Sequence, residues 1–182
     1  MKRLLPLIVS GIVLALTAVA QGQSGPQPPM SQYEKFVRRT DVVIVTQSYP
    51  VGSFPGGGGG YKVLVHVSTA VGNPRKFYGA RLSDHLVDFA QLAVIQDGLD
   101  KMIRAIHSSS ETPNTSSISY KSPFGVSANY YSFKTDGADE PKWNMYLVAG
   151  TYTYQSTDVE ILKTFRDLIA QARQKLISLG AR

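Results

Sequence analysis

The sequence predicts an α+β fold made of two similar halves, each a meander of three strands closed by an amphipathic helix. Three observations support this prediction. Runs of β-branched and aromatic residues are separated by Gly, Pro and Asn turns, two longer segments carry apolar residues at helical spacing, and a capping pattern precedes each of those segments. The expected order is β-β-β-α-β-β-β-α. Because the strand connections are short, we expect antiparallel sheets with the helices packed on one face.

The first 20 residues have the pattern of a secretory signal peptide. Lys2 and Arg3 precede an apolar run from Leu4 to Val19, and the AVA at 18–20 fits the small-x-small cleavage rule. The run is shorter than the roughly 20 apolar residues that cross a bilayer, which argues against a membrane anchor. We therefore expect cleavage after Ala20 and a periplasmic or secreted bacterial protein, with membrane contact only during export.

The remainder is organised as a tether and one domain. Residues 21–32 are rich in Gln, Gly and Pro without a hydrophobic pattern, which predicts a disordered tether. Residues 33–182 are expected to form a single α+β domain. Its halves, 33–107 and 117–182, are joined by the Ser/Thr-rich segment 108–116.

In the first half, strands are expected at 41–49, 61–71 and 76–87. Alternation in the second of these strands places Val63, Val65 and Val67 on one face. A helix should follow, because Asp88 and Gln91 have the spacing of a capping box. Its apolar stripe comprises Leu92, Ile95, Leu99, Met102, Ile103 and Ile106.

Five consecutive glycines, 56–60, raise the question of a phosphate-binding loop. Such a loop leads into a helix N-terminus, where free N–H groups meet the anion. Here the chain continues as the strand that begins at Tyr61. The glycines are therefore expected to connect two strands, since glycine tolerates the backbone angles of tight turns.

The second half repeats this organisation. Strands are expected at 117–121, 126–133 and 143–154. Thr157 and Glu160 have capping-box spacing before the final helix, and Gly180 is a suitable end. The apolar stripe of that helix comprises Leu162, Phe165, Ile169, Ala172 and Leu176.

Composition excludes several kinds of chemistry. The chain has no cysteine, so it has no disulfide framework, zinc–thiolate site or thiol nucleophile. The net charge of +6 includes two cations of the leader, and the longest basic run is Arg38-Arg39. A nucleic-acid footprint clusters its cations, so no nucleic-acid partner is expected.

The histidines and acids do not form a recognisable catalytic or metal-binding pattern. Asp84, His85 and Asp88 lie close in sequence, but Asp88 is explained as a helix cap. His66 lies within a strand, and His107 suits the C-terminus of a helix. No nucleophile elbow or S-x-x-K motif occurs. We therefore predict no catalytic residue, no metal ligand and no cofactor.

The most unusual feature of the second half is its aromatic content, which comprises Tyr120, Phe124, Tyr130, Tyr131, Phe133, Trp143, Tyr146, Tyr152 and Tyr154. Alternation along 143–154 places Tyr146, Tyr152 and Tyr154 on one face and Trp143 on the other. One helix cannot cover both faces, so an aromatic face formed with Tyr130 is the predicted binding surface. Core packing with cross-strand tyrosine pairs is the favoured explanation of the aromatic residues, and this face remains the best candidate for binding.

Two resemblances bear on these hypotheses. The segments SISYKSPFGVSANYYSF and KWNMYLVAGTYTYQSTDVEILKTFRDLIAQARQKL, with VDFAQLAVIQDGLDKMI in the first half, resemble uncharacterised exported bacterial proteins with meander-plus-helix repeats. That resemblance implies no activity. More loosely, the repeats are similar to single-strand nucleic-acid binders of the Whirly kind. The predicted export and the low, dispersed charge argue against transferring that function.

Three functional hypotheses follow. The first is a non-enzymatic exported module that binds a protein or cell-envelope component through Tyr130, Tyr146, Tyr152 and Tyr154. The alternative is an envelope hydrolase that uses loop carboxylates such as Asp136 and Asp139. The third is a binder of single-stranded nucleic acid.

Overall fold

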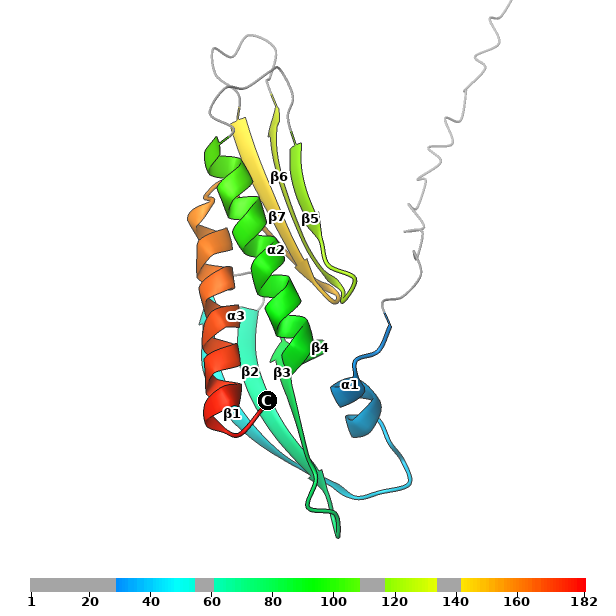
Figure 1. Ribbon diagram of the computed structural model, residues 1–182. Helices are drawn as coiled ribbons and strands as arrows, with labels where there is room; N and C mark the ends of the chain where they lie inside the picture. Colours follow the sequence, from blue (N-terminus) through cyan, green and yellow to red (C-terminus); the bar gives the residue numbers. More distant parts are fainter. Residues whose placement is uncertain (1–28, 55–60, 109–116, 134–141) are drawn as a thin grey trace, which may run out of the picture.

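The computed structural model describes residues 29–54, 61–108, 117–133 and 142–182, and it confirms the α+β class and the two halves (Figure 1). Each half contains one four-stranded antiparallel sheet with neighbours in chain order. The first sheet contains β1 (Ile44–Phe54), β2 (Tyr61–Ala70), β3 (Lys76–Leu82) and β4 (His85–Asp88). The second contains β5 (Ser117–Lys121), β6 (Val126–Phe133), β7 (Lys142–Ala149) and β8 (Tyr152–Ser156). The helices are α1 (Gln32–Val37), α2 (Phe89–Ser108) and α3 (Glu160–Ser178).

Each half has one strand more than the sequence predicted, because the third expected strand is a hairpin. In the first half, Leu82 pairs with His85 across a two-residue turn, with Ser83 at φ 60°. In the second, Ala149 pairs with Tyr152 across a turn that begins at Gly150, φ 61°. Such two-residue hairpin turns require positive φ. The predicted order β-β-β-α is therefore corrected to β-β-β-β-α in each half.

The glycine-rich segment joins two paired strands, as predicted. Phe54 at the end of β1 pairs with Tyr61 at the start of β2. The glycines themselves and the predicted signal peptide at 1–20 lie outside the described residues, as does the predicted linker 108–116 except for Ser108. A strand follows the glycines, as predicted, so they do not lead into the helix N-terminus that a phosphate loop requires.

The helix caps partly match the predictions. At the start of α2, the Asp88 N–H donates to Gln91 Oε1 at 3.0 Å and the Gln91 N–H donates to Asp88 Oδ1 at 2.9 Å, which confirms the capping box. At α3 the predicted Thr157 cap is wrong. The Glu160 N–H donates instead to Asp158 Oδ1 at 2.8 Å.

Helix α1 was not predicted, and it shortens the expected tether. Ser31 Oγ accepts from the Glu34 N–H at 2.9 Å and caps this helix, so ordered backbone begins before residue 33. Six residues are too few to show a reliable helical period. In Figure 1, α1 lies across the first sheet from the two long helices.

The two long helices run side by side along both sheets (Figure 1), and each packs on strands of the other half. Helix α3, from the second half, packs on β1, β2 and β3, whereas α2 packs on β5 and β6 as well as on β3 and β4. One continuous core results, in which Val65, Leu99 and Phe165 are fully buried. None of the helices in the described part of the chain is long and apolar enough to span a membrane.

Candidate functional site

The register of the second sheet separates the four tyrosines that were predicted to share a face. Tyr130 pairs with Met145, Tyr152 with Ala149 and Tyr154 with Leu147. Directly paired residues point to the same side of a sheet, and these three partners are fully buried. Tyr130, Tyr152 and Tyr154 therefore pack against the core on the helix side. Tyr146, which pairs with Asn129 and Gln155, lies on the other side.

The predicted common face is therefore wrong. The register of β6 with β7 places Tyr130 on the side away from Tyr146, and the turn at residues 150–151 does the same for Tyr152 and Tyr154. Period-two alternation through 143–154 assumes one uninterrupted strand. A two-residue hairpin turn reverses the chain there, so that Tyr152 faces the same side as Ala149 rather than the side of Tyr146. Trp143 also lies on the helix side, with its ring parallel to that of Tyr130 and the ring centroids 4.4 Å apart. Burial raises the pKa of the Tyr130 hydroxyl.

The opposite side of the second sheet faces solvent, and no described helix covers it (Figure 1). We refer to this side as the open face. Its side chains are all partly or well exposed: Ser117, Ser119, Lys121, Ser127, Asn129, Tyr131, Lys142, Asn144, Tyr146, Val148, Thr153 and Gln155. Sequence reasoning identified Tyr146 but missed Tyr131, although both follow from the correct register.

Tyr131 and Tyr146 form the aromatic centre of the open face. They come from neighbouring strands on a diagonal, with parallel rings and centroids 5.8 Å apart. Hydrogen bonding to Tyr146 is the largest cause of a raised pKa at the Tyr131 hydroxyl, and a hydrogen bond with Asn144 opposes it. The two rings are thus aligned as a pair, with their hydroxyls in one polar network.

Beside the tyrosines lies a second hydrogen-bonded group. Asn129 Oδ1 accepts from Ser117 Oγ at 2.9 Å and from Ser119 Oγ at 3.1 Å. Because the cross-strand neighbours hold these side chains, the group is oriented before any ligand arrives.

The described side chains of the open face include no carboxylate. Its charged members are Lys121 and Lys142, and the rest are hydroxyls, amides, two tyrosines and one valine. Such a surface offers aromatic rings for stacking and neutral donors and acceptors around them. These groups match the hydrogen-bonding and stacking chemistry of a polar uncharged ligand.

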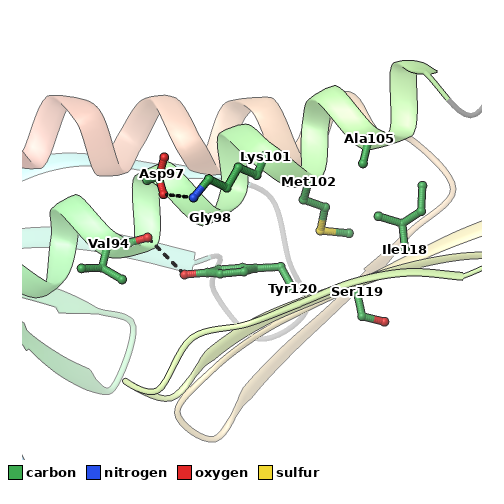
Figure 2. Close-up of a pocket in the computed structure, with 9 residues that line it drawn as sticks. All are labelled: Val94, Asp97, Gly98, Lys101, Met102, Ala105, Ile118, Ser119 and Tyr120. Atoms are coloured by element: carbon green, nitrogen blue, oxygen red, sulfur yellow. Dashed lines mark hydrogen bonds and ion pairs between the residues drawn. The ribbon is translucent and has the colours of Figure 1, made fainter.

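A separate groove lies between α2 and the edge strand β5 (Figure 2), with a volume of about 420 Å³. The Tyr120 hydroxyl donates to the Val94 carbonyl at 3.3 Å, so that the ring lies against Gly98. Asp97 and Lys101 form an ion pair at 2.7 Å along the helix. These contacts satisfy the polar groups of the groove and join the helix to the strand.

The histidines and acids considered above have structural partners. The His85 Nε2–H donates to the Phe124 carbonyl, and Asp84 accepts from the Thr151 hydroxyl, so both residues connect the two halves. His107 Nδ1 lies 2.8 Å from the Ile103 carbonyl at the end of α2. Within the described ranges no three His, Asp or Glu side chains are placed to hold a metal ion. Asp136 and Asp139 lie outside those ranges.

No protein-family model, curated protein or solved structure matches this chain. The resemblance to exported bacterial proteins, and the looser one to nucleic-acid binders, therefore stay predictions from the sequence.

Proposed function

We propose that the protein is a non-enzymatic, exported binding module whose open face contacts a neutral carbohydrate of the cell envelope. The observation that carries the proposal is the parallel pair Tyr131–Tyr146 in a surface of neutral hydrogen-bonding side chains. The flat, C–H-lined faces of sugar rings can stack on tyrosine, whose ring is apolar and whose hydroxyl is polar. Sugar hydroxyls both donate and accept, which matches serine, asparagine and glutamine side chains. Export itself rests on the leader at residues 1–20.

The chemistry of the open face favours a carbohydrate over a protein partner. Protein interfaces are organised around desolvated apolar anchors and often arginine. Among its described side chains, the open face contains one aliphatic residue, Val148, and no arginine. Against an apolar protein surface, its hydroxyl and amide groups would lose their hydrogen bonds to water and find no new partners, which costs free energy.

The other two hypotheses have less support. Binding of a nucleic-acid strand depends on a row of cations along the path of the phosphates. The described part of the open face offers two, Lys121 and Lys142, which is too few for such a row. A hydrolase would require a pair of carboxylates across a cleft, and the described residues of the open face carry none.

Co-sedimentation of the purified protein with insoluble polysaccharides tests the proposal. The panel comprises peptidoglycan sacculi, chitin and a β-glucan, at low salt and at about 0.5 M salt. We expect retention on at least one polysaccharide with little salt dependence, because the contacts are uncharged. Retention on single-stranded DNA that disappears at high salt, with no polysaccharide bound, would instead support the nucleic-acid hypothesis.

A further inference from the structure

A buried histidine lies beneath helix α1 on the outer face of the first sheet. His66 on β2 is 7% exposed, and its Nδ1 lies 2.8 Å from the Ser48 hydroxyl on β1. The Tyr33 ring of α1 lies parallel to the imidazole, with the centroids 6.2 Å apart. His66 is thus enclosed between the sheet and α1.

Helix α1 is attached through a few close contacts. The Tyr33 hydroxyl shares a hydrogen bond of 2.9 Å with Ser68 Oγ. The Tyr33 ring also lies so close to Gly79 that a Cβ there would be 2.3 Å from Tyr33 Cγ. Phe36 stacks on Phe77, with centroids 3.8 Å apart. A helix of six residues has almost no stability of its own, so these contacts keep α1 in place.

The groups that face His66 favour its neutral form. Arg81 on β3 and Asp84 after it line the same hollow as His66, and Tyr33 lines it from α1. The Asp84 carboxylate already accepts from Thr151. Strand β1 contributes the hydroxyls of Thr46 and Ser48 and carries no charged residue. Burial first, and then the Arg81 charge, lower the pKa of His66 below its ordinary value of 6.5.

We propose that α1 is a pH-dependent latch, in which protonation of His66 releases the helix and uncovers the outer face of the first sheet. An imidazolium is stabilised by solvation or by a hydrogen-bonded carboxylate. His66 is buried under Tyr33, its Nδ1 pairs with the Ser48 hydroxyl, and the Arg81 cation lines the same hollow. The latch acts on the first sheet, so it does not depend on carbohydrate binding at the open face of the second.

The direction of the pH dependence follows from linkage. The docked state has the lower His66 pKa and so binds fewer protons than the undocked state. The stability of docking is therefore greatest above the undocked pKa of His66, weakens as the pH falls through that pKa, and levels off below the lower docked pKa. Between the two pKa values, one proton changes the docking equilibrium at most about tenfold per pH unit.

Amide hydrogen exchange of residues 33–37 in the full chain, corrected for intrinsic rates, tests the latch at about pH 7.5 and about pH 5. Protection should fall at the lower pH in the wild type and in His107→Gln, whose histidine is exposed at the end of α2. His66→Gln should show no such fall. Equal losses of protection in the wild type and His66→Gln would overturn the proposal.

An NMR titration provides a second test that does not require a His66 variant to fold. Gly79→Ala places a Cβ against the Tyr33 ring and so displaces α1. The pKa of His66 should then be higher in Gly79→Ala than in the wild type, because the histidine is no longer covered. The same pKa in both proteins would show that α1 does not control this histidine.

Discussion

At the residue scale, the side of the sheet on which a tyrosine lies determines whether it stabilises the fold or remains available to a ligand. Tyr154 pairs with buried Leu147 and packs against the core. Tyr146, on the neighbouring strand, pairs with exposed Gln155 and lies on the open face. The same residue type therefore has two roles within one hairpin, and substitution can separate them.

Tyr154→Ala should reduce the free energy of unfolding by about 2 kcal/mol, because the half-buried ring leaves a cavity beside the core. Urea denaturation measures this loss. Thr153→Ala, one residue earlier and exposed on the open face, is the matched control and should cost less than about 0.5 kcal/mol. Equal losses in the two variants would contradict the assigned register.

At the element scale, the sequence patterns correctly predicted those features of helices and strands that depend on residues close together in the chain. The Asp88–Gln91 capping box and the buried Val63, Val65 and Val67 were predictable because both depend on neighbours in sequence. The turn at Ser83 was not, because it lacks the Asn-Gly or Asp-Gly pair that usually identifies a two-residue hairpin turn. Missing the turn at Gly150 reversed the predicted side of Tyr152 and Tyr154 relative to Tyr146. The register of β6 with β7, which no pattern within one strand reveals, places Tyr131 rather than Tyr130 on the side of Tyr146.

Helix α1 could not be predicted from the residues around it in the sequence, because its stability comes from contacts with residues far along the chain. The Tyr33 ring can pack on β3 only because Gly79 has no side chain, and the Phe36 ring stacks on that of Phe77. No spacing within residues 32–37 reveals these contacts.

Gly79→Ala should release α1 and cost about 1–3 kcal/mol, because the new methyl group overlaps the Tyr33 ring. Limited trypsin digestion should then cleave faster at Lys35, Arg38 and Arg39 than in the wild type. The same substitution in a Tyr33→Ala background should cost much less, since the two residues are directly coupled. An additive double mutant would contradict the packing of α1 on this glycine.

At the scale of the whole molecule, the crossed packing of the long helices makes the halves interdependent. Helix α3 covers the first sheet although it follows the second, and α2 reaches β5 and β6 although it follows the first. The turns reinforce this connection through Asp84 with Thr151 and His85 with Phe124. Neither half can bury its core residues alone.

Both halves should therefore unfold in one transition. Trp143 fluorescence reports on the second sheet, where its ring stacks on Tyr130, and amide exchange of β2 reports on the first. The two probes should give the same denaturation midpoint. Separate midpoints would show that the halves are independent domains.

No described helix covers the open face, and the proposed function depends on the chemistry of that face. The most direct test compares two double variants in the polysaccharide co-sedimentation assay. Tyr131→Ala/Tyr146→Ala removes the aromatic pair of the open face, whereas Tyr152→Ala/Tyr154→Ala removes two rings from the helix side. The first should weaken binding at least about tenfold, or about 1.4 kcal/mol, with little change in melting temperature. The second should lower the melting temperature and retain binding while folded. Full binding by Tyr131→Ala/Tyr146→Ala would contradict the claim.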